Sequence, residues 1–288
     1  MRLIISGGSG FLGKSVIKQW LSDPQNDLIA ITRSDKARDA IQQFLSEERN
    51  RLRFISNSER DLNSLKVKEN SEAVILHLAT LYRKNPSKTD LLLMKEANID
   101  LGIYLAHVAD ILGVKFVYTS SYMEYMNEVA PEVMAYVAMK KQLGNQIRLF
   151  PRIRVIENVI ADTYGPQDDR GKVLSQIIKA IKCGEPFQST NPNHLISLTH
   201  SMDVAAGVIN SFSFSGERAL CASKKLVTIE KLAKYAYQIS RKETPPDIVG
   251  EEIESDFRWL EFLHVPGWGP KIELYEGISE LMYEAQIF

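Results

Sequence analysis

Short apolar segments and longer amphipathic segments alternate along the first 160 residues of the chain. The apolar segments hold few polar positions, which is typical of strands covered on both faces. We predict strands at residues 3–6, 28–32, 52–55, 73–78, 114–119 and 153–159, and helices between them at residues 12–21, 37–48, 91–113 and 136–150. Such alternation predicts an α/β fold, a Rossmann-type doubly wound parallel sheet with helices on both faces.

The pattern changes after about residue 160, where the turn-rich segment "YGPQDDRG" begins. Helices are predicted at residues 172–183, 203–212, 229–241 and near the C-terminus, short strands at 195–200 and 218–222, and a Pro-rich connection at 242–252. We therefore expect a dinucleotide-binding domain over residues 1–160. A smaller α/β substrate lobe follows over residues 161–288, with some exchange of chain between the two lobes. Binding clefts favour such a junction.

Composition narrows the classes of partner. The 288 residues carry a net charge of −1 and 44% apolar residues, so neither nucleic acid nor an anionic membrane is expected to bind. Cys183 and Cys221 show no metal-binding spacing, and we expect free thiols and no metal. No apolar run reaches the length of a membrane span, and strand-like sequence starts at Met1. These features predict a soluble cytoplasmic protein.

The segment "GGSGFLGKS" at residues 7–15 fits two phosphate-binding motifs. Read from Gly8 it matches the P-loop, and read from Gly7 it is a variant of the dinucleotide fingerprint. A P-loop enzyme also needs a carboxylate at another strand end to hold Mg²⁺, and "AVILHLAT" and "VKFVYTSS" end without one. The dinucleotide interpretation is therefore favoured. We expect Lys14 and Ser15 to lie in the first turn of a solvent-facing helix.

The end of the second predicted strand bears on the choice of cofactor. NAD-binding proteins usually place an acidic residue there for the ribose 2′-hydroxyl, whereas this chain has Arg33 and Ser34. An arginine pairs well with a 2′-phosphate, and Lys36 and Arg38 add positive potential. This favours NADP (NADPH). Binding of NAD stays open, because Asp35 could turn back toward a ribose.

The segment "YVAMK" places Tyr136 and Lys140 on one face of a helix. The ordinary pKa of tyrosine is near 10, and a neighbouring ammonium favours the phenolate. We expect Lys140 to lower the pKa of Tyr136, and Tyr136 to deliver a proton to a carbonyl oxygen. Upstream, Ser121 ends the strand "FVYTSS" at the edge where open α/β sheets bind ligands. The alternative that Ser120 and Ser121 serve only as helix caps stays open.

The glycine loop, the strand-end serine and Y-x-x-x-K occur in the order typical of short-chain dehydrogenases. The chain resembles the extended branch of that family, the nucleotide-sugar epimerases, dehydratases and reductases. The motifs "SGGSGFLG", "HLAT", "GVKFVYTSS", "TYGPQDD" and "HSMDVAAG" carry the resemblance nearly from end to end. It implies a homodimer through the helices near residues 91–113 and 136–150. It also implies cofactor contacts from Gly7, Gly10, Phe11, Leu12, Gly13, Arg33, Ser34, Asp61, Leu62, Leu78, Ala79, Thr80, Asn98, Thr119, Tyr136 and Lys140.

Within that family, the residues after Ser121 argue against a dehydratase. The acidic pair of dehydratases is replaced by Tyr122 and Met123, and Glu124 stands one place late. The resemblance is greatest to 4-ketoreductases of CDP- and dTDP-linked deoxysugars. We predict an NADPH-dependent ketone reductase in which Ser121 binds the substrate oxygen and Lys140 also holds the nicotinamide ribose. An NAD-dependent epimerase and a regulatory protein that binds NADPH without turnover are the alternatives.

The substrate is expected to be a small nucleotide sugar. Its candidate contacts are Tyr82, Arg83, Ser121, Tyr122 and Asp162. Two positions depart from the family pattern: Ile196 replaces an arginine that grips the diphosphate, and Asp162 replaces an asparagine. Lys172, Arg170 or Arg218 would have to take over the role of that arginine. A substrate without a diphosphate also stays open.

Overall fold

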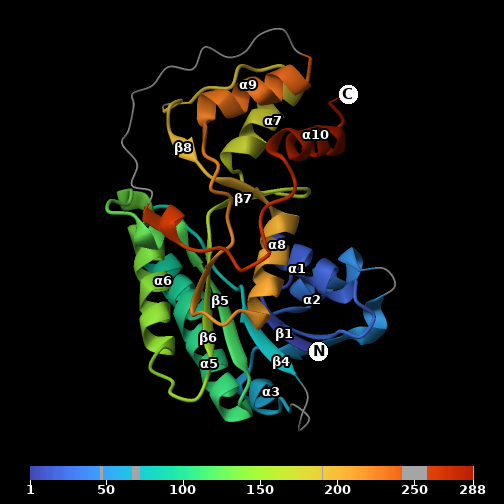
Figure 1. Ribbon diagram of the computed structural model, residues 1–288, viewed down its shortest axis with the longest axis vertical. Helices are drawn as coiled ribbons and strands as arrows, with labels where there is room; N and C mark the ends of the chain where they lie inside the picture. Colours follow the sequence, from blue (N-terminus) through green and yellow to red (C-terminus); the bar gives the residue numbers. More distant parts are fainter. Residues whose placement is uncertain (46–47, 67–71, 190, 242–257, 288) are drawn as a thin grey trace.

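A parallel sheet forms the centre of the molecule (Figure 1). The computed structural model describes residues 1–45, 48–66, 72–189, 191–241 and 258–287, and the predicted Pro-rich connection at 242–252 lies outside them. Among the described residues the sheet has seven strands, all parallel, in the order β10-β6-β5-β4-β1-β2-β3. The strands are β1 (Arg2–Ser6), β2 (Asp27–Thr32), β3 (Leu52–Ser56), β4 (Ala73–His77), β5 (Lys115–Ser121), β6 (Val155–Ile160) and β10 (Arg218–Leu220).

Helices cover both faces of this sheet (Figure 1). On one face, α1 (Phe11–Leu21), α2 (Asp35–Phe44) and α8 (Ser201–Asn210) pack on apolar side chains such as Leu3 and Leu28. On the other face, α3 (Glu59–Asn63), α5 (Leu101–Leu112) and α6 (Met134–Ile147) pack on Ile4, Ile75 and Phe116. Because alternate residues of each strand serve opposite faces, both clusters are built from the same strands. The predicted doubly wound fold is confirmed.

The order of the strands reverses between β1 and β4. The chain runs from β1 outward to β3, then crosses back to β4 and continues to β6 on the other side. In doubly wound sheets the loops at such a point diverge, and ligands bind beyond the carboxyl ends of the strands. The fold therefore brings the turn after β1 and the segment after β4 to the same edge.

The helix predicted at residues 91–113 is interrupted. It consists of α4 (Lys88–Lys95), a π-helical turn (Glu96–Asp100) and α5. The turn adds one residue per hydrogen-bonded ring, and it lets Asn98 bond to the backbone of Leu81. A periodicity argument could not find this interruption, because the apolar pattern continues through it.

A smaller lobe stands above the carboxyl edge of the sheet (Figure 1). Its core joins α7 (Val173–Cys183), α9 (Ile229–Ile239) and α10 (Leu274–Glu284). The strand predicted at 195–200 is two strands: β8 (Leu195–Ile196) pairs antiparallel with β11 (Val227–Thr228), and β9 (Leu198–His200) pairs with β7 (Asp162–Tyr164). The chain changes partner at Ser197, whose hydroxyl donates to the carbonyl of Ser223 (2.7 Å).

Segments of the second half return to the large sheet. Strand β10 extends that sheet next to β6, and α8 packs against α1. A division of the chain at residue 160 stays a prediction, and these two elements show where chain crosses between the lobes. No helix in the described part of the chain is both long and apolar enough to cross a bilayer.

A buried carboxylate ties the C-terminal segment to α8. Asp203 lies in the first turn of α8 and is 6% exposed. Its Oδ2 accepts hydrogen bonds from the backbone N–H groups of Lys271 (3.0 Å) and Ile272 (2.8 Å). The indole N–H of Trp268 donates to the backbone carbonyl of Asp203 (3.0 Å). The lead-in to α10 is thereby fixed against the Rossmann-type domain.

We expect Asp203→Ala to lower the free energy of unfolding by about 1–3 kcal/mol, because two backbone N–H groups lose a charged acceptor that is itself buried. Urea unfolding followed by tryptophan fluorescence measures the change. Asp39→Ala, which removes an exposed carboxylate from α2, is the control and should change little. Equal stabilities of the two variants would contradict this role of Asp203.

Candidate functional site

The turn between β1 and α1 is built by close backbone approaches. Gly7 has φ +78°, and a Cβ there would lie 2.5 Å from the backbone nitrogen of Ala79, after β4. A Cβ at Gly13 would overlap the carbonyl oxygen of Gly7. Gly10 is the N-cap of α1 and has no side chain that could occupy the helix start. The structure describes the whole first turn of α1, and none of its residues is acidic. Bare N–H groups at a helix start fit a pyrophosphate.

The side chains of the alternative P-loop motif serve packing. Ser15 is buried, and its hydroxyl donates to the hydroxyl of Ser201 on α8 (3.1 Å). The Lys14 ammonium lies 5.9 Å from the ring centroid of Phe44 on α2. Our expectation that both face solvent is wrong for Ser15, because α8 returns from the second half of the chain to cover α1. The hydroxyl of Ser15, which would bind Mg²⁺ in a P-loop, is engaged instead by Ser201.

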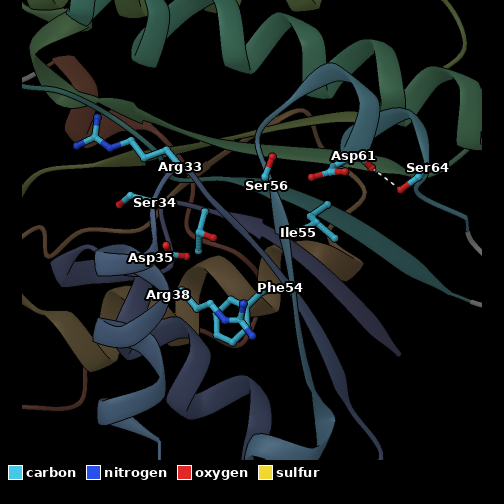
Figure 2. A pocket seen from close by; sticks show the side chains of 10 residues that line it. Arg33, Ser34, Asp35, Arg38, Phe54, Ile55, Ser56, Asp61 and Ser64 are labelled. Atoms are coloured by element: carbon cyan, nitrogen blue, oxygen red, sulfur yellow. Dashed lines mark hydrogen bonds between the residues drawn. The ribbon is translucent and has the colours of Figure 1, made fainter.

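A pocket of about 460 Å³ lies at the carboxyl ends of β2 and β3 (Figure 2). Figure 2 shows the guanidinium of Arg33 extending away from the other lining side chains, while that of Arg38 lies over the ring of Phe54, 5.1 Å from its centroid. The lining residues are Thr32, Arg33, Ser34, Asp35, Arg38, Phe54, Ile55, Ser56, Asp61 and Ser64. The pocket thus presents two cations, two carboxylates and several hydroxyls.

Three of these lining residues, Arg33, Ser34 and Asp61, are predicted cofactor contacts, and Asp35 and Arg38 were also considered from the sequence. The other five were not predicted: Thr32, Phe54, Ile55, Ser56 and Ser64. Strand β3 pairs in parallel with β2, so that Ser56 stands beside Thr32. The sequence did predict both strands, at residues 28–32 and 52–55. It did not show that these two strands are neighbours, so their carboxyl ends could not be assigned to one pocket. The hydroxyl of Ser64 donates to the carbonyl of Asp61 (2.6 Å), which shapes the pocket wall (Figure 2).

Asn98, a predicted cofactor contact, organises the segment after β4. The side chain is completely buried, and its Oδ1 accepts from the backbone N–H of Leu81 (2.6 Å) and the hydroxyl of Thr80 (3.0 Å). Its Nδ2 donates to the carbonyl of Leu81 (2.9 Å). Asn98 therefore fixes the backbone that carries Thr80 and Tyr82 into the site.

Lys140 is a buried cation beneath the site. It projects from α6, is 2% exposed, and its ammonium donates to the carbonyl oxygen of Thr119 on β5 (2.9 Å). Burial lowers the pKa of Lys140 to about 8, although the nearby carboxylate of Glu124 acts in the opposite direction. Lys140 is therefore still mostly protonated at pH 7, but its pKa lies only a little above that pH.

Tyr136 stands one helical turn before Lys140 and is half-buried. Its ring packs edge-to-face on Tyr82, with centroids 5.1 Å apart, and its hydroxyl shares a hydrogen bond with Thr80. Removal from water, with a further contribution from Glu124, raises the pKa of Tyr136. Our expectation of a lowered pKa is therefore wrong for this structure, because burial outweighs any benefit from Lys140.

Ser121 ends β5 and caps the short 3-10 helix Tyr122–Tyr125. Its Oγ accepts from the backbone N–H of Met123 (3.3 Å), which leaves the hydroxyl hydrogen free for a further acceptor. The capping role and a substrate contact are therefore compatible. Ser120 is also buried, and its hydroxyl has no hydrogen-bond partner in the part of the chain that the structure describes.

The predicted substrate contacts come together above Tyr136, except for one. The hydroxyl of Tyr122 donates to Asp162 Oδ2 (3.1 Å), and Lys172 Nζ lies 3.6 Å from Asp162 Oδ1. The same ammonium lies 5.3 Å from the ring centroid of Tyr82. Arg83 is separate: its side chain is 55% exposed and lies 3.9 Å from Asp90.

Trp259 is an unpredicted neighbour of this cluster. Its ring centroid lies 5.4 Å from that of Tyr122, and the residue is 1% exposed. Trp259 belongs to none of the motifs found in the sequence. It is also far from Tyr122 along the chain, so the sequence did not predict that the two rings are neighbours. Tertiary packing alone places it beside the candidate substrate contacts.

Two of the three suggested replacements for the family's arginine have structural roles. Arg170 donates to Asp168 and Thr163 and lies 4.0 Å from the ring centroid of Phe11. Arg218 donates to the buried Glu157 (3.0 Å), between aromatic rings. Lys172 is therefore the cation with access to the cluster around Asp162. Among the residues that the structure describes, no group of three or more His, Cys, Asp or Glu side chains could hold a metal ion.

Comparison with known proteins agrees with this geometry. The model of the NAD dependent epimerase/dehydratase family matches residues 3–213. UDP-glucuronic acid decarboxylase 3 of Arabidopsis thaliana is 23% identical over 316 positions, covering 96% of this chain and 87% of that protein.

Solved structures show the same fold. The UDP-glucuronic acid 4-epimerase of Bacillus cereus, in complex with UDP-glucuronic acid and NAD, superposes with a TM-score of 0.79 at 17% identity over 100% of both chains. The enzyme WbmF of Bordetella bronchiseptica, in complex with NAD⁺ and UDP, gives 0.76 at 18% identity, over 99% of this chain and 92% of that one.

We expect Lys140→Met to raise the free energy of unfolding at pH 7 by up to roughly 3 kcal/mol, because it removes a buried ammonium. The pKa of Lys140 is about 8 in the folded protein against 10.5 as the ordinary value. Between these values the unfolded chain binds more protons, so the stability of the unsubstituted protein rises with pH and the difference shrinks.

Urea unfolding at a series of pH values tests this prediction. Lys141→Met removes the adjacent exposed ammonium and serves as the control. A Lys140→Met protein less stable at pH 7, or a difference independent of pH, would show that burial of this charge costs no stability.

Proposed function

The chain belongs to the NAD dependent epimerase/dehydratase family, and on that premise we propose that it is an NADP-dependent reductase of a keto group on a nucleotide-linked sugar. One observation carries the proposal. Tyr136, Lys140 and Ser121 stand at the carboxyl edge of the sheet, on elements that flank the strand-order reversal where the glycine turn and the segment after β4 meet. These are the groups that a carbonyl reduction requires: an acid, a cation and a hydrogen-bond donor.

The cofactor, when bound, supplies the hydride. Tyr136 gives its phenolic proton to the carbonyl oxygen as that oxygen gains charge. The raised pKa of Tyr136 keeps the phenol protonated until it is needed, and the ammonium of Lys140, one turn away, stabilises the phenolate that is left. Ser121 donates its free hydroxyl hydrogen to the same substrate oxygen.

A nucleotide sugar is the substrate class that fits the cluster above Tyr136. Relatives whose names state a substrate act on UDP-linked sugars, among them UDP-glucuronic acid and UDP-glucose, which supports this class. Lys172 presents a cation for a phosphate or a carboxylate, and Asp162 and Tyr122 present acceptors and donors for sugar hydroxyls. The 4-keto-6-deoxysugars linked to CDP or dTDP are our specific proposal.

The preference for NADP rests on the pocket between β2 and β3. Arg33 and Arg38 both line it, the guanidinium of Arg38 lies over Phe54 and that of Arg33 extends from the rim (Figure 2), and Ser34 adds a hydroxyl at the start of α2. Asp35 lines the same pocket and favours the second candidate, an NAD-dependent epimerase, because a carboxylate there suits a ribose diol. The complexes of the related structures contain NAD.

A homodimer through α5 and α6 is part of the proposal. A pocket of about 340 Å³ lies on the outer face of these helices, lined by Ile103, Gln146, Leu149 and Phe150. Leu149 is 79% exposed and Ile111 is 66% exposed. Apolar side chains of this size in water favour a protein partner.

The decisive experiment offers NADPH and a CDP- or dTDP-linked 4-keto-6-deoxyglucose to the purified protein and follows NADPH absorbance. We expect oxidation of NADPH, and a loss of about 10²–10⁴-fold in kcat for Tyr136→Phe with unchanged affinity for NADPH. Tyr104→Phe, on α5, is the control. Full turnover by Tyr136→Phe would contradict the mechanism, and interconversion of sugars without net oxidation would establish the epimerase instead.

Arg33→Ala is expected to raise the KM for NADPH roughly tenfold or more, because a charge-assisted contact with the 2′-phosphate is lost. The KM for NADH should stay nearly unchanged. Lys18→Ala removes an exposed cation from the far end of α1 and controls for general electrostatics. If Arg33→Ala weakens both cofactors equally, the preference has another source.

A further inference from the structure

Glu124 is a buried carboxylate directly behind Ser121. It lies in the 3-10 helix Tyr122–Tyr125 and is 8% exposed. Its Oε1 accepts a hydrogen bond from the backbone N–H of Ser121 (2.8 Å), while Ser121 Oγ caps the same helix. Glutamate is rarely buried to this degree without a specific role, because removal of its charge from water costs free energy.

The surroundings of Glu124 include the candidate catalytic pair. When ionised, Glu124 raises the pKa of both Lys140 and Tyr136 on α6. The other charged or titratable groups that interact with it are Lys141 on α6, Glu157 on β6, Tyr118 on β5 and Tyr125 on its own helix. One side chain therefore connects the backbone of Ser121 with the charges of Tyr136 and Lys140.

We infer that Glu124 is a positioning residue for the reaction: its carboxyl group fixes the turn that presents Ser121, and it places an acidic group on a 3-10 helix that packs against α6, which carries Tyr136 and Lys140. The inference deepens the proposed function and rests on it for the chemistry. The contacts of Glu124 themselves do not depend on which sugar is bound.

The charge of Glu124 changes near neutral pH. Burial raises its pKa to about 7, against opposing contributions from the Ser121 N–H and from Lys140. Above that pH the carboxylate holds Lys140 as an ammonium and Tyr136 as a phenol, the form that donates a proton. Below it, Glu124 is neutral and this support is withdrawn. Because Lys140 and Tyr136 are protonated below pH 7 in either state of Glu124, the charge of Glu124 matters at alkaline pH, where it keeps Lys140 an ammonium to higher pH.

Glu124→Gln separates the two roles, because the amide oxygen still accepts from Ser121 N–H whereas the charge is lost. The probe is protein carrying ¹³C at the lysine Cε, with the Lys140 resonance identified by its absence in Lys140→Met. We expect the titration midpoint of Lys140 to fall by about one pH unit in Glu124→Gln. Glu128→Gln, an exposed neighbour, should leave the midpoint in place.

The unsubstituted protein supplies a second test that needs no variant to fold. There, the Lys140 resonance should show a smaller inflection near pH 7, caused by protonation of Glu124. Absence of this inflection, or an unchanged midpoint in Glu124→Gln, would overturn the inference.

A kinetic readout links the charge to the reaction. In Glu124→Gln the basic limb of the pH profile for NADPH oxidation should move to lower pH, with the affinity for NADPH unchanged. An identical profile would overturn the role of Glu124 in catalysis. If no ketone is reduced by the unsubstituted protein, the proposed function fails, whereas the Lys140 titration still decides whether Glu124 sets its charge.

Discussion

The site depends on one close backbone contact, between the glycine turn after β1 and the segment after β4. Gly7 adopts a left-handed conformation, and the backbone of Ala79 fills the space where a side chain would begin. This contact joins the start of α1 to the segment that carries Thr80 and Tyr82. Asn98 secures the same segment from the opposite side. The glycine turn and the candidate substrate contacts are therefore held in one fixed relation.

Buried charge is the second organising feature. The ammonium of Lys140 is removed from water. It donates a hydrogen bond to the carbonyl of Thr119 and interacts with the carboxylate of Glu124. Such a group destabilises the fold unless it is compensated, and the compensation here is incomplete, as the lowered pKa of Lys140 shows.

The cations in the second half of the chain have unequal roles. Arg170 and Arg218 are engaged by carboxylates and aromatic rings, which makes them parts of the architecture. Among the described residues, Lys172 lies at ion-pair distance from Asp162 and over the ring of Tyr82, and its side chain remains 36% exposed. The substitution of Ile196 for an arginine therefore coincides with a cation at another place in the same lobe. In the proposed function, Lys172 is therefore the cation that would bind an anionic group of the substrate near Tyr82.

The sequence by itself determined the order of strands and helices, the glycine turn and the pairing of Tyr136 with Lys140, because each depends on local periodicity or spacing. The tertiary structure decided what local rules cannot reach. It interrupted the helix at Asn98, returned α8 to cover Ser15, and placed Ser56 beside Thr32. It also reversed the expected effect on the pKa of Tyr136. The reason is the same in each case: burial and neighbours come from segments distant in the chain, and these set the energy of a buried polar group.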